Sequence, residues 1–168
     1  MIHVCSLALM PETVQAIGAR HVITLMRDTD QVTCPGSIRR ENHLILTMDD
    51  ISEPHDGYEL PAETHVARLV DFVGGWDRAA PLVVHCYAGI SRSTAAAFVA
   101  ACALNPQRDE AAIAKAIRVA SPTASPNRRI VSLADKFLDR RGRMLRALDT
   151  IGPGRAAYEG VPFRLDLE

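Results

Sequence analysis

The sequence predicts an α/β protein: a three-layer sandwich with a central, mainly parallel sheet of about four or five strands flanked by helices. Short apolar runs rich in Val, Ile and Leu recur along the chain, which is the pattern of strands buried on both faces. Segments with helical apolar spacing separate most of these runs, and such alternation favours a parallel sheet. The 168 residues suit one domain.

The first half of the chain contains three of the expected strands and two helices. The strands are predicted over residues 2–7, 21–26 and 43–48. Pro11 opens a short helix through Ala19, because a proline in the first turn loses no hydrogen bond. A loop of about a dozen residues follows Met48, long enough to suggest a role. Pro61 then starts a helix with apolar residues on one face.

The second half adds one strand and three helices. The strand is predicted over 81–85, and the helices over 93–104, from Asp109 onwards, and over 127–148. Asp109 is a typical N-cap residue. We expect residues 1–150 to form a single catalytic domain and residues 151–168 to be a C-terminal tail that docks or frays.

Composition and charge exclude several classes of protein. Lysine plus arginine number 19 against 20 acidic residues, a balance that argues against nucleic-acid binding through overall charge. The longest apolar run, 94–104, is half the length needed to cross a bilayer, so no membrane segment is expected. No export signal is visible and the four cysteines are scattered, which predicts a cytoplasmic protein with reduced thiols. The six histidines show no zinc-binding spacing, so we expect no metal and no cofactor.

Three cysteines are followed six residues later by an arginine: Cys34, Cys86 and Cys102. Only Cys86 lies where a buried strand turns into a helix. The Cys34 segment follows no apolar strand, and Cys102 falls inside a predicted helix. A strand-to-helix turn lets successive backbone N–H groups converge on one point, and the helix dipole there also favours negative charge. The sequence therefore predicts an anion site at Cys86.

This anion site contains the groups needed for phosphoryl transfer. The field that binds a phosphate also favours the thiolate form of Cys86, which is the nucleophilic form. Arg92 offers a planar fork for two phosphate oxygens, which a lysine could not reproduce. Ser93 places a hydroxyl behind the loop, where it could stabilise the departing thiolate.

The segment from His85 to Ser93 resembles the HCxxGxxR(S/T) signature of the cysteine-dependent protein tyrosine phosphatases. The similarity is closest to their small dual-specificity-like branch, including predicted bacterial tyrosine phosphatases, and its order of elements covers roughly residues 20–148. It implies that Cys86 is the nucleophile and that His85 orients the loop. The phosphate-binding residues implied are Tyr87, Ala88, Gly89, Ile90, Ser91 and Arg92. Asn127 follows Pro126 as in the Pro-Asn pair that opens the last helix of dual-specificity enzymes, and is expected to be a supporting residue.

The resemblance and the chemistry together imply a two-step hydrolysis through a phosphocysteine, with an aspartic acid as general acid and then base. The loop after Met48 offers Asp49, Asp50 and Asp56. Neighbouring strand residues point to opposite faces, so Asp49 and Asp50 cannot both face the site if strand geometry persists. Asp56 precedes a glycine, as in many ordinary turns. We predict Asp50, with Asp49 second and Asp56 third.

Alternatives remain open at this level. A rhodanese-type sulfurtransferase also uses a cysteine in a phosphate-like loop, and a pseudophosphatase would bind phosphorylated partners without turnover. The loop has no lysine, unlike family members that take 3-phosphoinositides, so a phosphorylated protein or small phosphoester is the expected substrate. Cys5 is a candidate for a protective disulfide with Cys86. Tyrosine-only against mixed specificity, the physiological substrate and the oligomeric state are not predicted.

Overall fold

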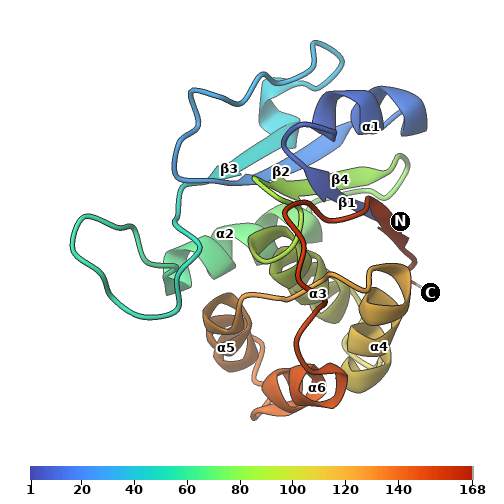
Figure 1. Cartoon of the computed structure of the whole chain (residues 1–168). Coiled ribbons are helices and arrows are strands. Elements are labelled where there is room, and N and C mark those ends of the chain that lie inside the picture. Colours follow the sequence, from blue (N-terminus) through green and yellow to red (C-terminus); the bar gives the residue numbers. More distant parts are fainter. Residues whose placement is uncertain (168) are drawn as a thin grey trace.

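The computed structural model describes residues 1–167, and one five-stranded sheet organises them (Figure 1). The strands are β1 (Ile2–Ser6), β2 (His21–Leu25), β3 (His43–Leu46), β4 (Leu82–Cys86) and β5 (Phe163–Leu165). Their order across the sheet is β3-β2-β4-β1-β5. The first four strands pair in parallel, whereas β5 pairs with β1 in the antiparallel direction. The predicted α/β class with a mainly parallel sheet is confirmed.

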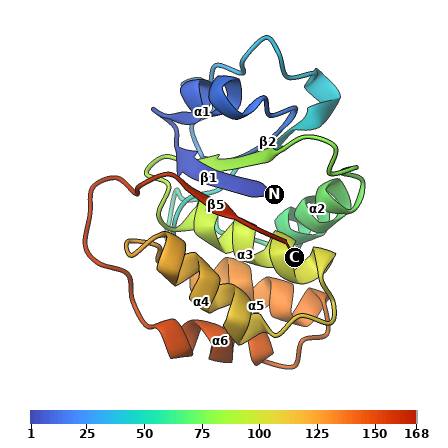
Figure 2. The ribbon, with the colours of Figure 1, turned by 90° about the vertical axis from the view of Figure 1, so that its right-hand side faces the viewer.

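Helices cover the two faces of the sheet unequally (Figures 1 and 2). One face carries α1 (Met10–Ile17) and the short η1 (Arg40–Asn42). The other face carries α2 (Glu63–Gly74), α3 (Arg92–Leu104), α4 (Glu110–Ala120), α5 (Arg128–Phe137) and α6 (Arg143–Ile151). Helix α3 is central to this thicker layer, and its residues from Ser93 to Cys102 are all buried. None of the helices in the described part of the chain is long and apolar enough to cross a membrane.

The single last helix expected over 127–148 is wrong, because the structure divides it into α5 and α6. The backbone between them takes left-handed conformations at Asp139, Arg141 and Gly142, which a continuous helix does not contain. Asp135 fixes this break. Its carboxylate accepts hydrogen bonds from the backbone N–H groups of Gly142 and Met144, at the start of α6. A buried side-chain acceptor therefore replaces the helical hydrogen bonds lost at the break.

Predicted helix starts agree with the capping observed. Proline occupies the first turn of α1. Asp109 accepts a hydrogen bond from the backbone N–H of Ala111 at the start of α4. The described part of the expected tail docks on the protein, since β5 extends the sheet beside β1 and buries Phe163 and Leu165.

Candidate active site

The loop between β4 and α3 lies at the carboxyl edge of the parallel strands. Strand β4 is buried along its whole length and ends at Cys86, and α3 begins at Arg92. Gly89 has φ +71°, and a Cβ atom there would lie 2.7 Å from the carbonyl carbon of Cys5. Only glycine fits this combination of left-handed backbone and close approach to β1. The glycine of the loop signature therefore lets the loop pack on the sheet edge.

The peptide carbonyls of this loop point outward, to the structure that surrounds it. Four carbonyl oxygens accept backbone N–H bonds from outside the loop: Tyr87 from Leu7 (3.1 Å), Ala88 from Gly160 (2.8 Å), Ile90 from Ser125 (2.9 Å) and Ser91 from Asn127 (3.3 Å). The peptide bonds within residues 1–167 are all trans, so the N–H of each peptide unit points away from its carbonyl. The N–H groups of residues 88–91 donate to no acceptor among residues 1–167. The loop thus presents free amides toward its centre, as an anion site requires.

Cys86 begins this loop and is 2% exposed. Its Sγ lies 3.2 Å from the Oγ of Ser93, a hydroxyl in the first turn of α3. A serine O–H at this distance can donate to a thiolate, and hydrogen bonds to ionised acceptors are stronger than neutral ones. The structure thus places Ser93 where sequence reasoning expected it, beside the sulfur.

Arg92 extends its guanidinium group from the start of α3 toward the loop after β3. One Nη donates to the carbonyl oxygen of Met48 at 2.9 Å. The Nε is buried and finds no hydrogen-bond partner among residues 1–167, although the Oδ2 of Asp50 lies 4.0 Å away. A buried donor without an acceptor is unfavourable and calls for an explanation. An oxyanion in the loop would satisfy it.

Asp50 lies at the mouth of the loop. Its Oδ1 accepts hydrogen bonds from the Ser91 hydroxyl at 2.7 Å and from the Asn127 side-chain amide at 2.8 Å. The side-chain oxygen of Asn127, Oδ1, caps α5 by accepting hydrogen bonds from the backbone N–H groups of Arg129 and Ile130. Asn127 therefore connects the start of a helix to the carboxylate that we expect to act as the acid.

Asp49 is engaged elsewhere. Its Oδ2 accepts a 2.7 Å bond from Arg27 and a 2.6 Å bond from the backbone N–H of Glu59. Desolvation raises the pKa of Asp49, but these two hydrogen bonds and the charges of Arg27 and Arg92 outweigh it and hold the pKa below its usual value. A carboxylate committed to such partners is a poor proton donor. Asp56 is exposed in the turn that precedes Tyr58.

His85 lies beneath the loop in a chain of hydrogen bonds. Its Nε2 is 2.7 Å from the Oγ1 of Thr24, which is 2.8 Å from the Nε2 of His43. Burial lowers the pKa of His85 to about 4, so the ring is neutral at physiological pH. Sequence reasoning missed Thr24 and His43. The available signal was a polar residue within the apolar run of β2 and a histidine at the start of β3.

The side chains of Cys5 and Cys102 are buried outside the loop. In the β1–β4 ladder Cys5 is paired with His85, and Ser6 with Cys86. Neighbouring residues alternate in direction, so the Cys5 and Cys86 side chains lie on opposite faces of the sheet, and Cys5 packs in the cluster under α1. A Cys5–Cys86 disulfide would require the backbone to move. Cys102 is buried within α3, where burial raises the pKa of its thiol to about 12.

The structure therefore brings Cys86, Ser93, Arg92, Asp50 and Asn127 to one point, and their catalytic roles stay predictions. Asp49 is paired with Arg27 instead. Among residues 1–167, no three His, Cys, Asp or Glu side chains gather in a group that could hold a metal ion.

Comparison with known proteins identifies the fold. No family model matches the chain, and no curated protein matches its sequence. Solved structures match it well: DUSP15 has a TM-score of 0.63 at 17% identity, over 90% of this chain and 92% of that one. Human DUSP28 has a TM-score of 0.63 at 16% identity, over 83% of this chain and 92% of that one. PTPMT1 in complex with PI(5)P has a TM-score of 0.63 at 16% identity, over 88% of this chain and 94% of that one. The chain therefore has the same fold as these phosphatase structures.

Proposed function

We propose that this chain is a phosphomonoester hydrolase of the protein tyrosine or dual-specificity type, acting through a phosphocysteine without a metal or cofactor. One observation carries the proposal. The Cys86 thiol begins a loop whose carbonyls point outward and whose amides are free, with the buried Nε of Arg92 beside it. A nucleophile, an amide cradle and a guanidinium group are sufficient for phosphoryl transfer, which depends mainly on positioning and charge stabilisation.

In the first step the Cys86 thiolate attacks phosphorus in line, an S–P bond forms and the ester P–O bond breaks. The loop amides and Arg92 hold the three equatorial oxygens. The carboxylic acid of Asp50 gives its proton to the departing oxygen, which leaves as a phenol or alcohol. Asn127 and Ser91 donate to the Oδ1 of Asp50, so they fix the direction of this carboxyl group.

In the second step water attacks the phosphocysteine. The Asp50 carboxylate takes a proton from the water as the O–P bond forms, and the S–P bond breaks to release inorganic phosphate. The sulfur leaves as a thiolate, and the Ser93 hydroxyl, 3.2 Å away, stabilises it by donating a hydrogen bond. The residues are then ready for another cycle.

A phosphorylated protein or small phosphoester is the proposed substrate. The loop between Cys86 and Arg92 contains no lysine to contact a second phosphate group. We propose a cytoplasmic location, because the mechanism needs Cys86 reduced and such compartments keep thiols reduced.

Aryl phosphate turnover tests the proposal when it is measured with a chelator present and then with vanadate. We expect turnover that survives the chelator and is blocked by vanadate. A parallel thiosulfate–cyanide assay tests for sulfur transfer. Sulfur transfer without phosphatase turnover would indicate a sulfurtransferase, and phosphopeptide binding without turnover would indicate a pseudophosphatase. Each of these two results would contradict the proposal.

Two substitutions sharpen this test. Cys86→Ser should abolish turnover but retain phosphoester binding, because the amides and Arg92 remain. Arg92→Lys should lose both rate and affinity, since a lysine cannot make two parallel hydrogen bonds. Cys34→Ser and Cys102→Ser are the matched controls and should remain active. If either of these controls were inactive instead, the choice of Cys86 would be wrong.

A further inference from the structure

We propose that the segment 154–165, here called the C-terminal strap, positions the phosphate loop, with Gly160 and Glu159 as its positioning residues. This inference rests on the proposed function, because it concerns the same loop. Figure 2 shows the strap running from α6, past the edge of the helical layer, to β5 in the sheet.

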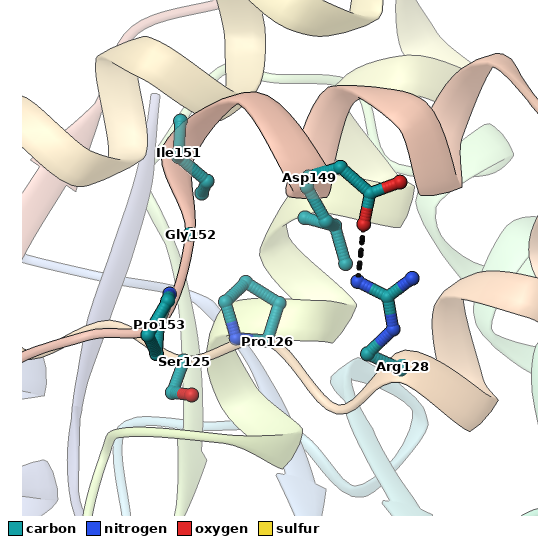
Figure 3. Close-up of a pocket in the computed structure, with 8 residues that line it drawn as sticks. Ser125, Pro126, Arg128, Asp149, Ile151, Gly152 and Pro153 are labelled. Atoms are coloured by element: carbon teal, nitrogen blue, oxygen red, sulfur yellow. Dashed lines mark hydrogen bonds and ion pairs between the residues drawn. The ribbon is translucent and has the colours of Figure 1, made fainter.

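The strap is anchored at its beginning to the segment 121–127. Gly154 packs so closely on the carbonyl oxygens of Thr123 and Ala124 that no Cβ would fit. The backbone N–H of Arg155 donates to the carbonyl oxygen of Pro122 at 2.9 Å. Just before the strap, Gly152 and Pro153 line a cavity of about 330 Å³ together with Ser125 and Pro126 (Figure 3).

The other end of the strap is anchored in the sheet. Strand β5 pairs with β1 from Val4↔Phe163 to Ile2↔Leu165, and both β5 partners are buried. Between the two anchors most residues are exposed, and Tyr158 is entirely solvent-accessible, but Gly160 is buried. The strap therefore spans from the segment 121–127 to the edge of the sheet.

Between these anchors the strap contacts the phosphate loop directly at Gly160. Its backbone N–H donates to the carbonyl oxygen of Ala88 at 2.8 Å. A Cβ added at Gly160 would lie 2.7 Å from the carbonyl oxygen of Gly89 and 3.3 Å from the Cγ1 of Ile90. The backbone of Gly160 does not have a positive φ, so it is space and not conformation that requires glycine here.

Glu159 fixes the strap to β1 beside this contact. Its Oε1 accepts a hydrogen bond from the hydroxyl of Ser6. Leu7, the next residue of the chain, donates its backbone N–H to the carbonyl oxygen of Tyr87. One side-chain contact thus connects the strap to the end of β1, and the residue that follows β1 holds the carbonyl of Tyr87 in the loop.

These contacts determine how the loop amides point. The carbonyl of Ala88 belongs to the same peptide unit as the N–H of Gly89, so the bond from Gly160 directs that N–H toward the loop centre. The segment 121–127, which the strap also contacts, holds the carbonyls of Ile90 and Ser91 through Ser125 and Asn127. The strap therefore supports both halves of the oxyanion cradle.

Gly160→Ala tests this role, with Gly74→Ala as the matched control. A Cβ at Gly74 meets nothing within 4 Å, so the control adds the same methyl group in open space. A misplacement of about 1 Å costs on the order of 100-fold in rate. We expect Gly160→Ala to lower kcat/KM for an aryl phosphate by about 10- to 100-fold and to weaken vanadate inhibition by a similar factor. Alkylation of Cys86 by iodoacetate at a fixed pH should also be slower, because misdirected amides attract the anionic reagent less strongly.

A second pair of variants tests Glu159 without adding bulk. Glu159→Ala and Ser6→Ala should each weaken vanadate inhibition, and the double variant should lose little more than either single one. A role in stability alone would lower Tm yet leave vanadate inhibition, kcat/KM and the alkylation rate unchanged below Tm. That result, or a Gly160→Ala variant that behaves like Gly74→Ala, overturns the proposal.

Different results would refute the proposal about the strap and the proposal about the function. If the wild-type chain hydrolyses no phosphoester but binds vanadate, the proposed function fails, and vanadate binding by the Gly160→Ala variant still decides the role of the strap. If the wild-type chain binds no vanadate, there is no cradle to position, and both proposals fail.

Discussion

Replacing Asp50 by Asn separates its proposed role as an acid from its place in the hydrogen-bond network. The Asn side chain is the same size, and its carbonyl oxygen can accept the bonds that Ser91 and Asn127 now donate to Oδ1. The amide group would then take the place of Oδ2, 4.0 Å from the Nε of Arg92. The variant therefore keeps the local geometry and loses the transferable proton.

The expected loss follows from the chemistry of the leaving group. A general acid contributes typically 10²- to 10⁴-fold, or roughly 3 to 5 kcal/mol of barrier. That contribution is largest when the leaving oxygen is strongly basic. We expect Asp50→Asn to slow hydrolysis of phosphotyrosine by about 10²- to 10⁴-fold, and hydrolysis of an activated nitrophenyl phosphate far less. The alkaline limb of the pH–rate profile should disappear as well.

The matched variants are Asp49→Asn and Asp56→Asn, measured on both substrates. Both should retain the wild-type dependence on the leaving group, because Asp49 is paired with Arg27 and Asp56 is an exposed turn residue. If Asp50→Asn retained that dependence and one of the other variants lost it, the assignment of the acid would be refuted.

Three further predictions concern positioning and stability. Arg27→Met should slow hydrolysis of phosphotyrosine in part as Asp50→Asn does. Arg27 donates hydrogen bonds to Asp49 and to the carbonyl oxygen of Gly57, and these bonds hold the loop that carries Asp50. Burial lowers the pKa of His85 from 6.5 to about 4, so between these pH values the unfolded chain binds a proton that the folded chain does not. The contribution of His85 to the free energy of unfolding is therefore fully present above about pH 6.5 and falls by about 3 kcal/mol as the pH drops to 4, which urea unfolding would measure. Arg140→Met should cost about 3 kcal/mol in thermal or urea unfolding, since it removes a buried partner of Glu110.

Each of these predictions has its own control. Lys136→Met, another loss of a cation, should leave the leaving-group dependence intact. His85→Gln should flatten the acid side of the stability profile, and a slope equal to that of the wild type would assign the effect to other histidines. Arg39→Met removes a partner from an ion pair on the surface and should leave Tm unchanged. A similar loss of stability in Arg39→Met and Arg140→Met would contradict the account of the buried pair.

The fold was predictable because local pattern and burial agree along most of the chain. The apolar runs at β2 and β4 and the cap at Asp109 are local signals, and each gave an element close to its observed position. The break between α5 and α6 was not predictable in this way. It depends on the Asp135 carboxylate reaching the backbone of Gly142 and Met144, and helical periodicity does not reveal such a contact.

The candidate site was likewise predictable only in part. Residues close in sequence, from His85 to Ser93, could be assigned to one site because a strand-to-helix turn has a known shape. Contacts that distant segments make with this site could not be predicted. Gly160 lies 72 residues from Ala88, and nothing in its short neighbourhood indicates the contact. The sequence ranked Asp50 above Asp49, but the pairing of Asp49 with Arg27 is a contact that only the folded chain supplies.

Trapping of the covalent intermediate tests the central claim most directly. The protein would be mixed with an aryl phosphate carrying labelled phosphorus, quenched in acid during turnover, and digested for mass spectrometry. We predict labelled phosphate on the peptide that contains Cys86 and none in the Cys86→Ser variant. Turnover with no labelled cysteine, or with the label on Cys34 or Cys102, would contradict the mechanism.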